Sequence, residues 1–133
     1  MTITDLLKAG LEQYQRGNLE GAEKKFRQVI LVDNRNIHGL NLLGMICVNT
    51  GRHEEAVQLI TDALKISPID AQAQGNLGLA YQRMGNLKLA ESCFRKSIEL
   101  GGKNRTIFNS LGNVLRESGR ASEAVQVYES TLK

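Results

Sequence analysis

The sequence has 133 residues, of which 41% are hydrophobic and 23% charged, the composition of an ordinary folded domain with a core. Its 17 basic and 14 acidic side chains leave a scattered net charge of only +3, so neither a nucleic acid nor an anionic membrane is indicated as a partner. The start lacks a signal-peptide pattern, no apolar run approaches the ~18 residues of a membrane span, and Cys47 and Cys93 lack paired spacing, so we expect a cytoplasmic protein without disulfides.

Four registers of similar residues recur every 34 residues without an insertion or deletion, and this period indicates four copies of one structural unit. Two registers are glycine, one is alanine and one is always large and apolar. They comprise Gly10, Gly44, Gly78 and Gly112; Gly17, Gly51, Gly85 and Gly119; Ala22, Ala56, Ala90 and Ala124; and Phe26, Ile60, Phe94 and Tyr128.

Each repeat is preceded by a residue whose side-chain oxygen can cap a helix, in chain order Thr2, Asn36, Asp70 and Asn104. A first helix of about 14 residues is predicted after each cap, and Thr2 with Asp5 reads as a capping box. The glycine register that begins at Gly17 then marks the end of each first helix. A left-handed residue is needed at that point, and glycine adopts this conformation without a Cβ penalty.

A second helix follows each turn glycine. In the third repeat the first helix presents Leu77, Gly78 and Tyr81 to the core, with Gln74 at the first core position, and the second helix presents Leu87, Ala90, Phe94 and Ile98. In the fourth repeat the first helix presents Phe108, Leu111 and Leu115. The second helices end at Pro68 in the second repeat and at Gly101-Gly102 in the third.

The glycine register that begins at Gly10 lies inside the first helices, where each glycine costs about 1 kcal/mol relative to alanine. A stabilising contact elsewhere must offset this cost. We expect close approach of the two helices of a pair, with Gly78 facing Ala90.

This pattern of small residues, large residues and a period of 34 resembles the tetratricopeptide repeat family. The resemblance covers residues 3–36, 37–70, 71–104 and 105–133, which predicts one domain over residues 1–133. It implies an all-α, right-handed superhelical solenoid of antiparallel helix pairs, about eight helices in all. The tryptophan that is usual at repeat position 4 is replaced by Leu6, Leu40, Gln74 and Phe108, and Gln13 at position 11 suggests a weaker first repeat.

In the family the first helices line a concave surface that binds partner segments. Charge is sparse and asparagine abundant at the corresponding positions here. We therefore hypothesise that carboxamides hold the peptide units of an extended chain while apolar side chains form pockets beside them. The predicted groove residues are Asn41, Met45, Asn76, Leu79, Gln82, Asn109, Ser110, Asn113 and Arg116. The alternative is that these side chains are merely solvated.

Two known binding modes of the family fit poorly. The clamp that holds the carboxylates of chaperone tails requires basic residues at positions that carry Asn41, Thr106 and Ser110 here, and we reject it. The asparagine ladder of O-linked N-acetylglucosamine transferases is matched at Asn76 but broken at Lys8, Leu42 and Ser110, so this similarity is loose.

No catalytic constellation, cofactor motif or metal-ligand spacing is present in the sequence, so we predict a non-enzymatic chain with no cofactor and no metal. Cys47 and Cys93 fall at or beside core positions and are expected to be buried. The aromatic residues other than Tyr14 repeat at core positions, which argues against an RNA-stacking surface.

The last helix, predicted over about 121–132, should leave Val127 and Leu132 partly uncovered, because no capping helix follows. Either the chain is a fragment of a longer protein, which we favour, or this end is covered by self-association. The leading functional prediction is a scaffold that binds a protein or peptide partner, with no nucleic acid and no membrane. The alternative is the substrate-recruiting N-terminal arm of a larger enzyme such as a glycosyltransferase or sulfotransferase.

Overall fold

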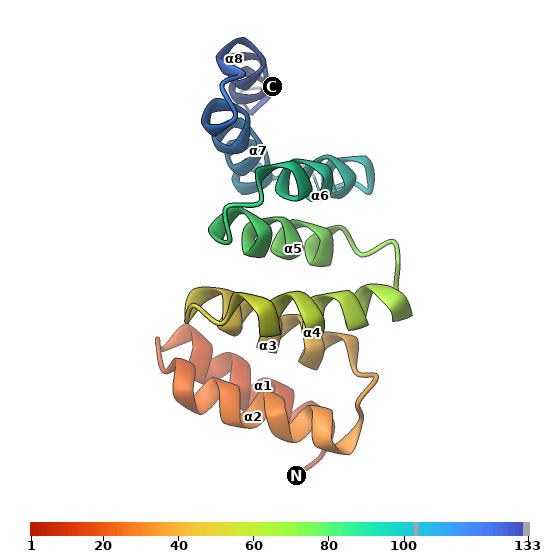
Figure 1. Ribbon diagram of the computed structural model, residues 1–133. Helices are drawn as coiled ribbons and strands as arrows, with labels where there is room; N and C mark the ends of the chain where they lie inside the picture. Colours follow the sequence, from red (N-terminus) through yellow and green to blue (C-terminus); the bar gives the residue numbers. More distant parts are fainter. Residues whose placement is uncertain (103, 132–133) are drawn as a thin grey trace. The chain divides into compact units, whose positions relative to one another are not determined.

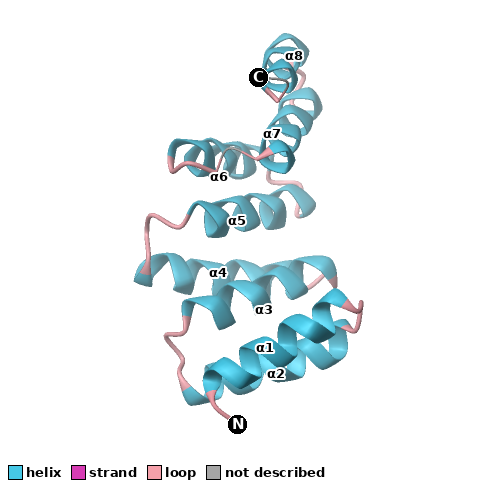
Figure 2. Cartoon of the chain, turned by 180° about the vertical axis from the view of Figure 1, so that it is seen from behind, coloured by secondary structure: helices cyan, strands magenta, loops and turns pink. Residues whose placement is uncertain are grey.

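A computed structural model describes residues 1–102 and 104–131, and within them the chain forms eight α-helices (Figure 1). No strand occurs among these residues, and short loops join the helices (Figure 2). In chain order the helices are α1 (Ile3–Gln15), α2 (Leu19–Val32), α3 (Ile37–Asn49), α4 (His53–Ile66), α5 (Ala71–Arg83), α6 (Leu87–Glu99), α7 (Arg105–Glu117) and α8 (Ala121–Ser130). The predicted all-α class, built from antiparallel helix pairs, is confirmed.

The chain divides into two compact units, Met1–Pro68 with α1 to α4 and Ile69–Lys133 with α5 to α8. We call these the first and the second unit. Their border lies two residues before the predicted boundary between the second and third repeats. Each unit therefore corresponds closely to two of the predicted repeats.

The predicted helix caps are confirmed. The side chains of Thr2, Asn36, Asp70 and Asn104 each accept a hydrogen bond from a backbone N–H in the first turn of α1, α3, α5 and α7. Thr2 and Asp5 form the reciprocal capping box, with both hydrogen bonds at 3.1 Å. These contacts satisfy backbone donors that a helix end otherwise leaves without a partner.

The turn glycines also behave as predicted. Gly17, Gly51, Gly85 and Gly119 all have a φ angle close to +80°, which lies in the left-handed region that glycine adopts without strain. After α6 the chain turns again at Gly101, whose φ is +98°. The chain therefore reverses sharply after each first helix, and the two helices of a pair lie against each other.

The nearest neighbours of the mid-helix glycines are large side chains of the paired second helix. A Cβ on Gly78 would lie 2.7 to 3.0 Å from ring carbons of Phe94, whereas Ala90 is not among its nearest neighbours. The equivalent large residues Phe26, Ile60 and Tyr128 cover Gly10, Gly44 and Gly112 in the same way. Each glycine of this register thus makes room for a large side chain, and at Gly44 the backbone oxygen of Ala56, in the alanine register, also lies within contact, 3.7 Å from a Cβ.

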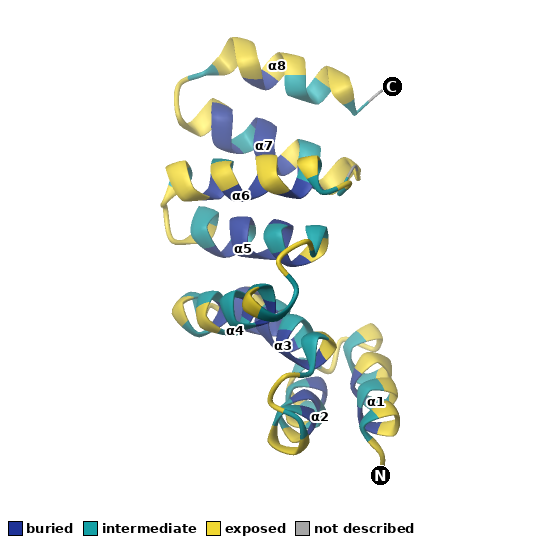
Figure 3. Cartoon of the chain, turned by 90° about the vertical axis from the view of Figure 1, so that its right-hand side faces the viewer, coloured by how far each residue is buried: buried dark blue, intermediate teal, exposed yellow. Residues whose placement is uncertain are grey.

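The core of the second unit lies where α6, α7 and α8 meet (Figure 3). Phe94, Leu111 and Leu115 are buried there, and Phe108 is only half-buried. Val127 is partly buried against this core, and Leu132 lies outside the described residues. Among the described residues, no helix combines the length and hydropathy needed to cross a membrane.

Candidate binding face

The nine predicted groove residues fall into both units. Asn41 and Met45 lie on α3 of the first unit and are half-buried. The other seven lie on α5 and α7 of the second unit, where these two helices make contact. We call the surface formed by the groove positions of α5 and α7 the α5–α7 face, and it carries Gln72, Asn76, Leu79, Gln82, Thr106, Asn109, Ser110, Asn113 and Arg116.

A pocket of about 370 Å³ opens between the N-terminal halves of α5 and α7. α5 contributes Gln72, Asn76 and Leu79, and α7 contributes Thr106 and Ile107. A water molecule occupies about 30 Å³ of liquid, so the pocket has room for a side chain of a bound segment. Its polar lining residues are neutral amides and hydroxyls among the described residues: Gln72, Asn76, Ser97, Asn104 and Thr106.

Asn76 is the most informative of these residues. Only 9% of its surface is exposed, and its amide nitrogen Nδ2 is buried without a hydrogen-bond partner among the described residues. A buried polar group without a partner costs about 1–3 kcal/mol, and native proteins contain few of them. Because Asn76 lines the pocket, a ligand that presents an oxygen there would supply the missing acceptor.

The floor of the pocket is closely packed. The hydroxyl of Ser97 on α6 donates a 2.7 Å hydrogen bond to the carbonyl oxygen of Ala71, so this buried group is satisfied. A Cβ on Gly102 would lie 2.9 Å from the carbonyl oxygen of Ser97, and one on Gly75 would lie 2.5 Å from Cδ1 of Ile107. The glycines therefore let the surrounding helices and loop approach each other beneath the pocket.

Ser97 and Gly102 were absent from the sequence-based prediction of the site. A signal was present for Ser97, since Val29 and Ala63 occupy the same register in the first two repeats. A hydroxyl at a register that is apolar in the first two repeats points to a hydrogen bond, which here goes to Ala71. Gly102 was interpreted only as a helix terminator.

Asn113 is already engaged within the protein. Its Oδ1 accepts a hydrogen bond of 2.5 Å from the hydroxyl of Tyr128 on α8. Asn76 and Asn113, which the sequence made equal candidates for holding a peptide, therefore differ in what they can offer a partner. Asn113 retains its amide donors, while one of its acceptor sites is occupied.

The remaining predicted residues of the second unit vary in exposure. Asn109 and Arg116 are exposed, and Leu79 is half-buried beside the pocket. Ser110 is only 8% exposed, which leaves little of it for a partner. The Gln82 Nε2 donates a hydrogen bond of 3.4 Å to Glu117 and so links α5 to α7.

The first unit shows a corresponding link. The Nδ2 of Asn49 on α3 donates a hydrogen bond of 3.4 Å to the hydroxyl of Tyr14 on α1. Both pairs are separated by 35 residues and occupy the same repeat positions. Tyr14, which we expected at the end of the groove, is half-buried and connects consecutive first helices.

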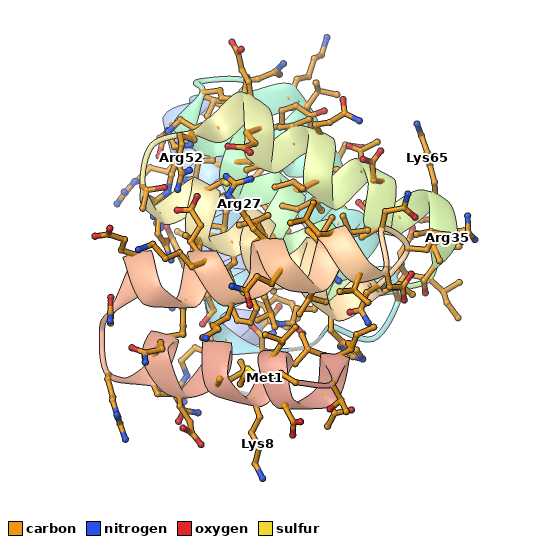
Figure 4. The ribbon with its side chains drawn as sticks, turned by 90° about the horizontal axis from the view of Figure 1, so that it is seen from below. Met1, Lys8, Arg27, Arg35, Arg52 and Lys65 are labelled. Atoms are coloured by element: carbon orange, nitrogen blue, oxygen red, sulfur yellow. The ribbon has the colours of Figure 1, made fainter. Side chains whose placement is uncertain are left out.

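The strongest electrostatic interactions lie on the second helices of each pair. In the first unit Arg52, at the start of α4, donates hydrogen bonds of 2.7 and 2.6 Å to the carboxylate of Glu23 on α2. Arg27 contacts Glu23 at 2.8 Å and Glu55 at 3.0 Å. Figure 4 labels the two arginines of this cluster, Arg27 and Arg52. Hydrogen bonds from Arg52 and Arg27 lower the pKa of Glu23 from 4.5 to about 2, although burial opposes this shift.

The second unit repeats this cluster with Glu91, Arg95, Arg120 and Glu123. Burial alone would raise the pKa of Glu91, but hydrogen bonds from Arg95 and Arg120 outweigh it and lower that pKa. Glu23 and Glu91 are therefore ionised partners of arginine and are unsuited to accept a proton near neutral pH.

The two cysteines are buried, as predicted, and neither forms a disulfide. Burial raises the pKa of both thiols to about 11. A thiol with such a pKa is almost entirely protonated at neutral pH and is a poor nucleophile. Cys47 and Cys93 are thus small buried side chains rather than reactive groups.

The profile of the tetratricopeptide repeat family matches residues 33–103 and 69–133. The chain belongs to this family, whose repeats generally serve as protein-interaction modules. The resemblance stated from the sequence is therefore confirmed.

Curated relatives share the repeats over part of their length. The chain is 28% identical to human tetratricopeptide repeat protein 7B over 94 residues, which are 71% of this chain and 11% of that protein. It is 32% identical over 84 residues to the type IV pilus assembly protein PilF of Pseudomonas aeruginosa, which covers 63% of this chain and 33% of that protein. The chain thus spans only a small part of these two relatives.

Solved structures share the fold. A crystal structure of MamA aligns with a TM-score of 0.87 over 98% of this chain and 77% of its own, at 22% identity. An O-GlcNAc transferase of Thermobaculum terrenum aligns with a TM-score of 0.82 over 85% of this chain and 22% of its own, at 23% identity. At these identities the likeness concerns the fold alone.

Proposed function

We propose that this chain is a protein-interaction scaffold that binds an extended segment of a partner protein along its first helices. The single observation that carries the proposal is Asn76, whose buried Nδ2 lacks a partner and lines the pocket of the α5–α7 face. A scaffold whose only task was to hold itself together would gain stability from a leucine at this position. A bound segment that supplies an acceptor for Nδ2 would offset the cost of burying Asn76 without a partner.

The chemistry of the α5–α7 face supports a peptide as the ligand. Gln72, Asn109 and Thr106 are exposed, and they offer both donors and acceptors to the peptide units of a chain that lies across them. Leu79 provides an apolar contact beside them. In the first unit Asn41 and Met45 supply the same two kinds of group, and we propose them as peptide contacts of that unit.

A photo-cross-linking experiment tests this proposal. p-Benzoylphenylalanine is placed at Gln72 or Thr106 on the α5–α7 face, and at Lys88 on α6 or Ser122 on α8 as matched exposed controls. Native extracts are irradiated, and the cross-linked segments are mapped by mass spectrometry. We expect one partner segment to be captured from both face positions and not from the controls. Equal capture from all four positions would refute binding at this face.

The second candidate function is recruitment of substrates to a larger enzyme. It is favoured by the likeness to the O-GlcNAc transferase chain, of which this chain spans 22%. On this proposal the partner segment captured at Gln72 and Thr106 is an enzyme substrate, and a catalytic domain follows Lys133 in the reading frame. The test is to read that frame: a stop codon directly after Lys133 would exclude the arm of a larger enzyme.

A further inference from the structure

The pocket of the α5–α7 face has a more specific chemistry than a general peptide groove. We propose that it is a subsite for a primary carboxamide, the side chain of an asparagine or glutamine in the bound segment. This inference rests on the proposed function, because it names the group that the binding face would select. It starts from Asn76, whose buried Nδ2 needs an oxygen acceptor.

The depth of Asn76 favours a side chain over a main-chain group. Its side chain is nine-tenths buried, and the pocket above it is bounded by Leu79 and Ile107. The carbonyl oxygen of an extended main chain projects by a single bond, and the neighbouring side chains hold that main chain away from such a recess. The oxygen of an asparagine or glutamine side chain lies two or three bonds further out and can reach Nδ2.

The neutral lining favours a carboxamide over a carboxylate. The described residues around the pocket carry amides and hydroxyls, and none of these residues is charged. Among the described lining residues a carboxylate would meet only neutral donors, and its loss of hydration on entry is costly without a cation. The N-terminus of α7 would return only about 0.3–1 kcal/mol of this cost.

A carboxamide can also both accept and donate hydrogen bonds in the pocket. Its oxygen accepts from Nδ2 of Asn76, and its NH₂ group donates to an oxygen of Gln72, Asn104 or Thr106 at the rim. Asn104 already accepts a 2.9 Å hydrogen bond from the N–H of Ile107, which holds its side chain in place beside the pocket. Two-sided complementarity of this kind discriminates more strongly than apolar contact, since a wrong ligand leaves buried groups without partners.

The pocket is a feature of the second unit. In the first unit the residues at the registers of Asn76 and Ser97 are Lys8 and Val29. An exposed lysine and a buried valine replace the buried amide and the buried hydroxyl. The first unit therefore provides an internal comparison that shares the fold and lacks the proposed subsite.

Small probes test the subsite without knowledge of the partner. The ¹⁵N-labelled full chain is titrated with propanamide, with the isosteric propanoate, and with N-methylacetamide as a mimic of the main chain. The readouts are the side-chain NH₂ signals of Asn76 and the backbone amides of Gly75 and Thr106. We expect propanamide to shift these signals with an affinity at least about tenfold higher than that of either other probe.

Two variants complete the experiment. Asn76→Leu should abolish the response to propanamide, and Gln126→Ala, which changes an exposed amide on α8 outside the pocket lining, should preserve it. Propanoate binding as tightly as propanamide would overturn the carboxamide assignment, and so would equal binding of N-methylacetamide. The wild-type comparison of the three probes stands even if a variant were poorly folded.

The outcome is distinguishable from failure of the proposed function. Capture of a partner at Gln72 and Thr106 without any response to propanamide would leave the binding face intact and refute the subsite. A propanamide response without selective capture would support the subsite and refute binding of a partner along the face.

Discussion

Arg52 forms a two-pronged ion pair with Glu23, and Arg120 bonds to Glu91 at 2.6 Å at the same place 68 residues further along the chain. At the intermediate register the sequence has Val57 and Asn86, which cannot form this pair. The charge clusters therefore recur with every second repeat, and each lies inside one of the two compact units. The charge clusters thus follow a period of 68 residues, which is twice the 34-residue period of the sequence.

The first prediction concerns the pH dependence of the first unit. The pKa of Glu23 is lowered from 4.5 to about 2 in the folded chain, so its contribution to stability is fully present above pH 4.5. That contribution is lost as the pH falls towards 2. We expect Glu23→Gln to lower the free energy of unfolding at pH 7 by about 1 kcal/mol and to flatten its fall between pH 4.5 and 2.

Urea titrations at a series of pH values measure this difference. Glu20→Gln is the matched control, because Glu20 lies 3.9 Å from Lys24 and both side chains are largely exposed. Its curve should follow that of the wild type. Parallel curves for Glu23→Gln and the wild type would show that Glu23 is not ionically coupled to folding.

The second prediction concerns Gly78. Alanine favours a helix over glycine by about 1 kcal/mol, yet a Cβ here would lie 2.7 Å from a ring carbon of Phe94. Overpacking of a core typically costs about 1–3 kcal/mol, so we expect Gly78→Ala to be destabilising overall. Thermal unfolding followed by circular dichroism measures the effect.

A second substitution separates crowding from other causes. If the ring of Phe94 is the obstacle, adding Phe94→Leu to Gly78→Ala should cost less than Phe94→Leu costs in the wild type. Strict additivity of the two changes would contradict the packing explanation. The structural basis is that both residues belong to one helix pair, α5 and α6.

The third prediction contrasts two asparagines. Asn76→Leu removes a buried donor that has no partner, so we expect the free energy of unfolding to rise by about 1 kcal/mol. Asn113→Leu removes the acceptor of the Tyr128 hydroxyl, and we expect a fall of about 1 kcal/mol. Chemical denaturation measures the free energy of unfolding of both variants. A decrease in both would mean that Asn76 has a structural partner.

The fourth prediction concerns the cysteines. With pKa values of about 11, Cys47 and Cys93 should have about one thiol in a thousand ionised at pH 8. We expect iodoacetamide to label the folded chain very slowly and the chain in denaturant rapidly. Rapid labelling of either residue in the folded chain, located by peptide mapping, would show an accessible thiolate.

Much of the fold was predictable because its determinants are local. Asn104 caps α7 by accepting from a residue three positions along, and Gly85 takes a left-handed conformation that depends on its own backbone. Interactions of this range repeat whenever the sequence repeats. For that reason the 34-residue register placed the helices, their caps and their turns, and it identified the family.

The candidate site depended on contacts between distant segments. The sequence offered Asn76 and Asn113 as similar side chains, and only the packing of α8 against α7 gave Asn113 a partner in Tyr128. Likewise Ser97 and Gly102 reach the pocket from α6 and the loop after it. Repeat position alone does not reveal whether a buried polar group is satisfied, because its partner comes from another helix.

The sequence by itself therefore determined the helical repeat, since period, caps and turn glycines act through neighbouring residues and need no knowledge of the whole. The tertiary structure decided which large side chain packs against each helical glycine. It also decided which asparagine keeps a donor without a partner. The ring of Phe94 lies nearest to Gly78, and Asn76 rather than Asn113 is left without a partner among the described residues. Both results depend on contacts between different helices. Side chains from different helices must fill the interior at close packing, and buried polar groups must find their hydrogen-bond partners on other helices.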